Sequence, residues 1–170
     1  YLNWRARGRE YPRFSDHQDR KGIRTRLLEE FEEFSKFCES HFGQRPHPVR
    51  VELAKVDQFV ELKHWDGFQD LAQLIPWLKD FAAFSKSGEP GISVRFGEQK
   101  SAGTLSVSMD LGRLMSEAAP ARVLKLETRT NRSLVGFGGD FKDLFSLMNE
   151  ELNDVFANLV PDSQRARFQG

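Results

Sequence analysis

Cationic and aromatic side chains alternate near the start of the chain, a combination suited to binding single-stranded nucleic acid. Guanidinium and ammonium groups hold phosphates, and flat rings stack on bases. The candidate nucleic-acid-binding residues are Trp4, Arg5, Arg7, Arg9, Arg13, Arg20, Lys21 and Arg24. Nucleic-acid binding is therefore one function that the sequence predicts.

The same stretch also has a purely structural interpretation, in which the rings belong to the core and the arginines form ion pairs. The 25 basic and 25 acidic residues give a formal net charge of zero, which disfavours a uniformly basic nucleic-acid binder. An acidic run follows, and it has three interpretations. Its carboxylates pair with the arginines, form a solvated helix face, or form a docking face for a basic protein. The run consists of Glu29, Glu30, Glu32 and Glu33. We favour the structural interpretation.

A second candidate surface is a protein interface. Residues 1–5 have the composition of a strand, and an open strand edge needs a partner. Carboxylates on a helix face suit a basic partner. The candidate interface residues are Tyr1, Leu2, Trp4, Glu29 and Glu33. We therefore expect a protein partner or a homo-oligomer.

Catalytic, metal and cofactor sites are not indicated. The histidines lack metal-ligand spacing and carboxylate motifs. The single cysteine, Cys38, excludes an intramolecular disulfide and a cysteine-based zinc site. The glycines within 136–139 precede a helix without the lysine of a phosphate-binding loop, so they indicate a turn. The histidines are His17, His41, His47 and His64. We expect no catalytic residue, metal or cofactor.

Hydrophobic periodicity predicts the elements that position these residues. The predicted order is strand 1–5, helix 20–42, strand 49–62, a helix within 65–86 broken at Pro76, strands 92–96, 105–111 and 124–130, and helix 140–160. The first helix has apolar residues at steps of three and four, which we expect to face the core. They are Ile23, Leu27, Phe31, Phe34, Cys38 and Phe42. Asp140 is the expected N-cap of the last helix.

This order predicts an α+β fold. The antiparallel sheet should have about five strands, with the helices at about 20–42 and 140–160 packed on one face. A single domain is expected over residues 1–161, followed by a polar tail at 162–170. No apolar run is long enough to span a bilayer, so no membrane association is expected.

Short motifs suggest a relationship. Asn3-Trp4-Arg5, Tyr11-Pro12-Arg13 and the strand start Glu52-Leu53 follow one another in the chain. In these the chain resembles the C-terminal two-thirds of an uncharacterised, sporadically distributed bacterial protein family. The resemblance covers nearly the whole chain and implies a bacterial source and a missing N-terminal portion. The chain departs from the family pattern at residues 55–57, where Lys-Val-Asp replaces Tyr-Ile-Asn. No role is therefore transferred to those positions.

The sequence therefore predicts a non-catalytic binding or interaction module, located in the cytoplasm. We expect it to be a subunit of a larger bacterial assembly, such as a defence or toxin–antitoxin accessory system, by analogy with other sporadically distributed families. Nucleic-acid binding through the basic and aromatic N-terminal stretch is the alternative. A third hypothesis is an enzyme acting on a small ligand in a groove between helix and sheet.

Overall fold

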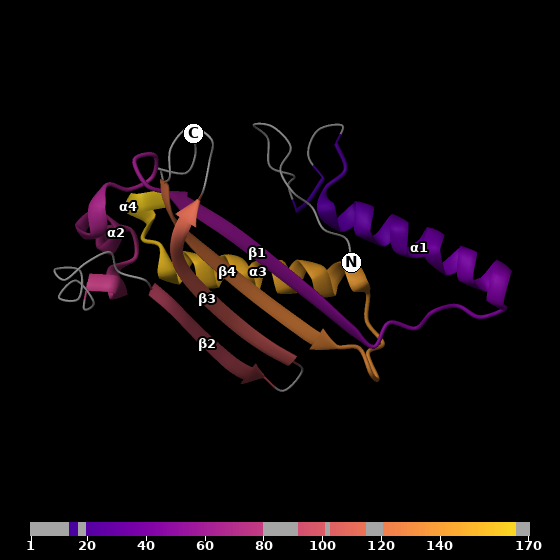
Figure 1. The fold of residues 1–170 in the computed structure, drawn as a ribbon. Helices are drawn as coiled ribbons and strands as arrows, with labels where there is room; N and C mark the ends of the chain where they lie inside the picture. Colours follow the sequence, from indigo (N-terminus) through magenta and orange to yellow (C-terminus); the bar gives the residue numbers. More distant parts are fainter. Residues whose placement is uncertain (1–13, 17–19, 80–91, 101–102, 115–120, 166–170) are drawn as a thin grey trace. The chain divides into compact units, whose positions relative to one another are not determined.

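The computed structural model describes residues 14–16, 20–79, 92–100, 103–114 and 121–165. The predicted strand over residues 1–5 lies outside this part of the chain. The elements, labelled in Figure 1, are α1 (Ile23–Phe42), β1 (Arg50–Val60), α2 (Gly67–Leu74), β2 (Ile92–Lys100), β3 (Gly103–Leu114), β4 (Ala121–Ser133), α3 (Phe141–Leu159) and α4 (Asp162–Arg165).

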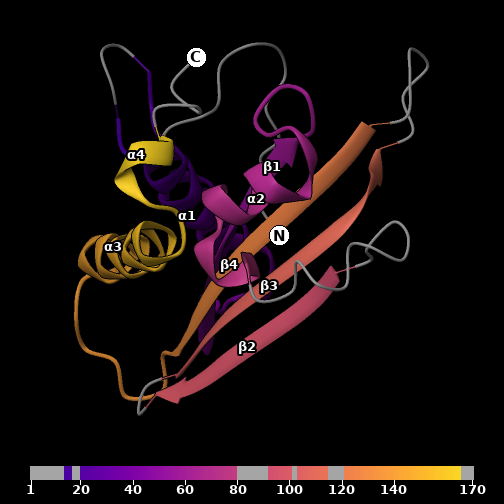
Figure 2. The same ribbon diagram turned by 90° about the vertical axis from the view of Figure 1, so that its left-hand side faces the viewer.

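The strands form one antiparallel sheet in the order β1-β4-β3-β2, so β1 and β2 are its edges (Figure 2). Lys55 in β1 lies opposite Thr128 in β4, and Val107 in β3 lies opposite both Thr128 and Phe96 of β2. The α+β class, the antiparallel sheet and the two main helices α1 and α3 are confirmed. The described part of the sheet has four strands rather than about five.

The two faces of the sheet differ in chemistry, because successive side chains of a strand point to opposite sides. The outer face carries charged side chains that pair across and along strands: Arg129 Nη1 of β4 lies 2.7 Å from Glu52 Oε1 of β1, and Lys125 Nζ lies 2.8 Å from Glu127 Oε2 within β4. The inner face carries the core residues Leu124 and Leu126 of β4. This alternation allows one face of the sheet to stay hydrated.

The core lies where α2 and the turn after it cover the inner face. It consists of Phe59, Trp65, Leu71, Leu74, Ile75, Leu78, Met109, Leu124, Leu126 and Val160. The predicted interruption at Pro76 is confirmed, because α2 ends at Leu74 and a 3-10 turn occupies residues 76–79. Proline has no N–H for a helix interior but fits a first turn.

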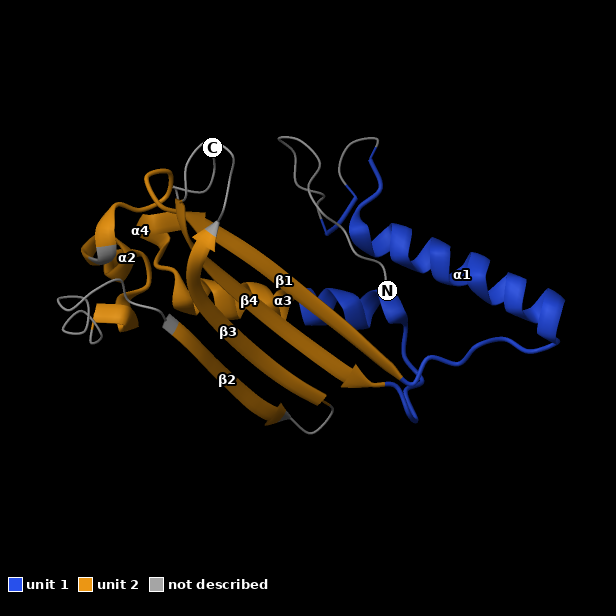
Figure 3. Cartoon of the chain, viewed as in Figure 1, with its two compact units in different colours: residues 1–49, 134–149 blue, residues 50–133, 150–170 orange. Residues whose placement is uncertain are grey.

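The chain divides into two compact units, which are described separately (Figure 3). The first consists of residues 1–49 and 134–149, and the second of residues 50–133 and 150–170. The predicted single domain over 1–161 therefore includes the first unit and most of the second, whose last residues, 162–170, fall in the predicted tail. In the first unit, α1 packs on the first half of α3: the Phe31 and Phe141 ring centroids are 6.5 Å apart, and Arg24 Nη1 donates to Ser146 Oγ at 2.8 Å. This unit joins segments far apart in sequence.

The ends of α3 follow local sequence signals. The backbone N–H of Lys142 donates to Asp140 Oδ1 at 2.7 Å, which confirms Asp140 as the N-cap. Beyond Pro161 the predicted polar tail begins with the short helix α4. Arg165 fixes α4 to the end of α3, since its Nη2 donates to the carbonyl of Ala157 at 2.7 Å.

In the second unit, charged and polar groups lie between the inner face and the second half of α3. We call them the polar seam; it consists of Lys55, Asp57, Thr130 and Arg132 of the sheet with Glu151 and Asn153 of α3. Arg132 Nη2 lies 2.6 Å from Glu151 Oε2, Thr130 Oγ1 donates to the same oxygen at 2.7 Å, and Lys55 Nζ donates to Asn153 Oδ1. Burial lowers the pKa of Lys55 and raises the pKa of Asp57.

The β2–β3 hairpin depends on a close backbone approach at Gly103. A Cβ there would collide with the backbone carbonyl of Asn131 in β4, so we expect Gly103→Ala to lower the free energy of unfolding by about 1–3 kcal/mol. Gly97→Ala is the control, because nothing described lies within 4 Å of a Cβ at that position. Urea unfolding of both variants tests this, and equal midpoints would contradict the close approach.

Candidate functional site

The most prominent surface feature of the described chain is one side of α1. Each of Glu30, Glu33, Phe34, Phe37 and His41 lies three or four residues from another member of the set, which places them on one side of the helix. We call these five residues the α1 face. The exposed fractions are 54% for Phe34 and 49% for Phe37. Single exposed apolar residues are common, but adjacent exposed rings on one helix side are typical of interfaces.

The rings at the end of the α1 face contact each other. The Phe37 and His41 rings stack with centroids 4.2 Å apart and an interplanar angle of 27°. Phe42, the last residue of α1, meets Phe37 edge-on at 6.1 Å and 76°. The Nδ1 atom of His41 lies 2.8 Å from Ser40 Oγ and 3.0 Å from the Phe37 carbonyl oxygen, which holds the imidazole against the helix. The cluster therefore presents aromatic side chains in mutual contact at the protein surface.

The carboxylates of α1 fall into two groups. Glu29 is paired with Lys21 at 2.6 Å, and Arg45 Nη2 donates to Glu32 at 2.8 Å. Glu30 and Glu33 are exposed and form no ion pair with any residue that the structure describes. Of the two acidic residues predicted for the interface, Glu33 therefore lies on the α1 face with an unneutralised carboxylate, whereas Glu29 is engaged within the chain.

The predicted burial of the apolar stripe of α1 is wrong for Phe34 and Phe42. Phe42 is 71% exposed, and Cys38 is only partly buried. The packed side of α1 follows Phe31 and the buried Ser35, whose hydroxyl donates to the Phe31 carbonyl at 2.7 Å. Phe34 is displaced from this side because each residue turns a helix by about 100°. Aromatic residues thus occupy both the packed and the exposed side.

Most of the predicted N-terminal residues lie outside the part of the chain that the structure describes. This applies to Tyr1, Leu2, Trp4, Arg5, Arg7, Arg9 and Arg13. Arg20 is exposed, just before α1, while Lys21 pairs with Glu29 and Arg24 bonds to Ser146. Lys21 and Arg24 therefore make contacts within the chain, Lys21 to an acidic residue of α1 and Arg24 to a hydroxyl of α3.

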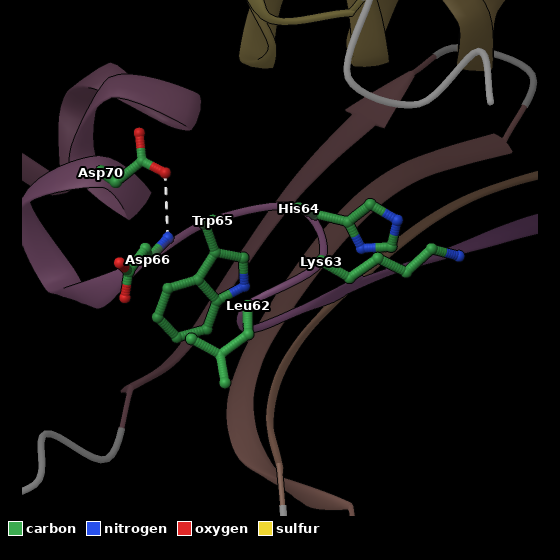
Figure 4. A pocket seen from close by; sticks show the side chains of 6 residues that line it. All are labelled: Leu62, Lys63, His64, Trp65, Asp66 and Asp70. Atoms are coloured by element: carbon green, nitrogen blue, oxygen red, sulfur yellow. Dashed lines mark hydrogen bonds between the residues drawn. The ribbon is translucent and has the colours of Figure 1, made fainter.

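A second feature is a shallow, open pocket of about 270 Å³ at the loop between β1 and α2 (Figure 4). Its lining residues are Leu62, Lys63, His64, Trp65, Asp66 and Asp70. Leu62 is exposed and has φ of 63°, an uncommon backbone conformation for a bulky residue. Asp70 accepts the backbone N–H of Asp66 at 2.9 Å, drawn as a dashed line in Figure 4. The polar groups of this pocket therefore hold the loop itself.

His64 closes the loop onto the end of β1. Its Nδ1 accepts the backbone N–H of Val60 at 2.8 Å, and its own backbone N–H donates to the Val60 carbonyl at 2.8 Å. Accepting a hydrogen bond at Nδ1 requires the unprotonated nitrogen, so the imidazole is neutral with its proton on Nε2. Burial, together with the charge of Lys63, lowers the pKa of His64. Its role is to complete the backbone hydrogen bonding of Val60.

Trp65 anchors the same loop to the core. Its indole N–H donates to the Phe59 carbonyl at 2.8 Å, and the Arg122 guanidinium lies 5.2 Å from its ring centroid. Arg122 Nε also donates to Glu61 Oε2 at 2.7 Å, and this hydrogen bond lowers the pKa of Glu61. The arrangement combines a cation–π contact with a charge-assisted hydrogen bond.

No group of three or more histidine, cysteine, aspartate and glutamate side chains that could hold a metal occurs among the described residues. None of the described helices is both long and apolar enough to cross a bilayer. Comparisons of the chain with family models, with curated proteins and with solved structures find no match.

Proposed function

We propose that this protein is a non-catalytic binding module that recognises another protein through the α1 face. The observation that carries the proposal is the exposure of Phe34 and Phe37 beside the unpaired carboxylates of Glu30 and Glu33. Aromatic residues supply much of the energy of protein interfaces because they bury a large area on binding.

The charges of the α1 face specify the chemistry of the partner. Carboxylates beside exposed rings favour a segment that carries aliphatic side chains flanked by lysine or arginine, since complementary charge speeds association and fixes orientation. An amphipathic helix of this composition could lie along α1 with its apolar residues on the two Phe rings. The partner in this proposal is therefore a basic amphipathic segment.

The proposal includes a setting in the cytoplasm of a bacterium, as a subunit of a defence or toxin–antitoxin accessory assembly. The presence of one cysteine suits a reducing compartment, and the bacterial source follows from the family resemblance of the N-terminal motifs. The assembly type is an analogy with sporadically distributed systems.

The double substitution Phe34→Ser with Phe37→Ser is expected to weaken binding of a leucine- and lysine-rich amphipathic peptide by about tenfold or more, because it removes the aromatic contact area. Unsubstituted protein should prefer this peptide to one in which glutamate replaces lysine. Fluorescence anisotropy with both peptides measures these affinities. Lys36→Ser is the control, since Lys36 is exposed on another side of α1.

Equal affinity for the two peptides, or an equal loss in the Lys36 control, would contradict recognition by the α1 face. Nucleic-acid binding is tested beside it with a single-stranded oligonucleotide titrated at two salt concentrations. Salt-sensitive binding that is lost when Arg5, Arg7 and Arg9 become alanine would favour the alternative function instead.

A further inference from the structure

Within the part of the chain that the structure describes, the edge of β1 that faces away from β4 offers backbone groups for pairing. At the two ends of the β1–β4 ladder, Glu61 N–H donates to the Arg122 carbonyl and Leu134 N–H donates to the Val49 carbonyl, both at 2.9 Å. In an antiparallel ladder, residues that bond to one neighbour alternate with residues whose N–H and C=O point the other way. Odd-numbered residues of β1 therefore bond to β4, and even-numbered residues face the open edge.

His64 determines where this open edge ends. Val60 is even-numbered, and its N–H and C=O are both satisfied by His64. No described residue bonds to the edge-facing backbone groups of the preceding even-numbered residues, which are Glu52, Ala54, Val56 and Gln58. An open edge of this length is available for another strand.

Asp57 supplies a second observation, because the charge of Lys55 on the same face compensates its carboxylate only in part. The carboxylate stands on the inner face of β1, partly buried, and makes no hydrogen bond or ion pair with any residue that the structure describes. Burial raises the pKa of Asp57. Lys55 points to the same face but is bonded to the Asn153 amide. A partly buried carboxylate of this kind calls for a cationic partner.

We propose that two copies of this chain join their β1 strands edge to edge, antiparallel, about a twofold axis at Val56. The backbone of Val56 then bonds to Val56 of the second copy, and Ala54 bonds to Gln58. On the inner face, Lys55 of each copy lies opposite Asp57 of the other, in the type of pair whose side chains approach most closely. The ladder stops where His64 satisfies Val60.

Charge selects this register over its neighbours. A twofold axis at Lys55 would oppose two ammonium groups, and an axis at Asp57 would oppose two carboxylates. An axis at Ala54 would place Asp57 opposite Val51 and leave its charge uncompensated. Only the axis at Val56 compensates both charges. Such a pairing is isologous, so it uses both edges and closes at two copies.

Disulfide capture in a Cys38→Ser background tests the register in the full chain. Residues that share a backbone-bonded pair have Cα atoms about 5.5 Å apart, within reach of a disulfide. Val56→Cys should therefore give a covalent dimer on mild oxidation. Ala54→Cys is the matched control on the same exposed face, because residue 54 would lie about 14 Å from its counterpart, too far for a disulfide.

A covalent dimer of Val56→Cys without one of Ala54→Cys would support the proposal, and any other pattern would overturn it. A charge test is independent of cysteine. Sedimentation should show a dimer of the unsubstituted chain, weakened about tenfold or more by Lys55→Asp or Asp57→Lys alone. Mixing these two variants should restore the dimer, since every opposed pair is then of opposite charge. Variants that remain dimeric when separate, or that stay apart when mixed, would overturn the proposal.

Discussion

Replacement of Trp65 by alanine is expected to lower the free energy of unfolding by about 3–5 kcal/mol. Trp65 is only 2% exposed, so its removal leaves a large cavity beneath the loop that follows β1. The substitution also leaves the Phe59 carbonyl without its indole donor and Arg122 without its aromatic partner. Loss of the indole hydrogen bond and of the cation–π contact adds to the cavity cost.

Urea unfolding monitored by circular dichroism measures this effect, and Trp77→Ala provides the comparison. Trp77 is partly buried and meets the exposed Phe96 ring edge-on at 5.8 Å, so its removal opens a smaller cavity. We expect it to cost less than half as much as Trp65→Ala. Similar losses in the two variants would show that the loop is not fixed by Trp65.

Glu151→Ala is expected to destabilise the protein by about 3–5 kcal/mol, the usual cost of removing one partner of a buried ion pair. The side chains of Arg132 and Glu151 are only 12% and 13% exposed, and their ionised groups are 2.6 Å apart. Without Glu151, the Arg132 guanidinium and the Thr130 hydroxyl lose their shared acceptor within the polar seam. The cost arises mainly from the uncompensated charge that is left behind.

A matched control distinguishes the effect of burial on stability from the effect of ion pairing alone. Lys21 and Glu29 also approach to 2.6 Å, but their side chains are 59% and 47% exposed. Water screens an exposed pair, so Glu29→Ala should cost less than about 1 kcal/mol. Chemical unfolding of both variants makes the comparison. If Glu151→Ala cost no more than Glu29→Ala, the polar seam would be hydrated rather than buried.

Elements whose local signals agree with their packing were predictable. Asp140 at the expected N-cap and Pro161 just past the end bound α3, and Pro76 separates α2 from the turn that follows. The β2–β3 hairpin was predicted from its two alternating runs, although the paired strands extend further than predicted, to Lys100 and from Gly103. In each case one short stretch of sequence determines the backbone conformation, so no distant residue is needed.

The polar seam could not be predicted in this way. Alternation along β1 places Lys55 and Asp57 on the same face as Val51 and Phe59, yet hydropathy assigns charged residues to solvent. Their partly buried position depends on Asn153 and the second half of α3, which are distant in sequence. The odd-numbered positions of Lys55 and Asp57 in β1 did indicate the inner face, but their charges indicated solvent.

The aromatic residues of the α1 face were missed because periodicity cannot separate two overlapping apolar sides. Phe31 and Phe34 both fit steps of three and four, but only Phe31 meets Phe141. Likewise no local pattern indicates that His64 would accept a hydrogen bond from Val60. Both assignments depend on which tertiary contacts form, and tertiary packing overrides local preference.

The first unit combines residues 1–49 with residues 134–149, and this affects folding during synthesis on the ribosome. The segment bearing α1 emerges before the sheet, but its packing partner Phe141 is translated only after all the strands that the structure describes. Until then the nascent helix has both aromatic sides open to solvent, a species prone to misassembly. Translation speed and chaperone access should therefore influence the yield of native protein more than for a chain whose early segments fold alone.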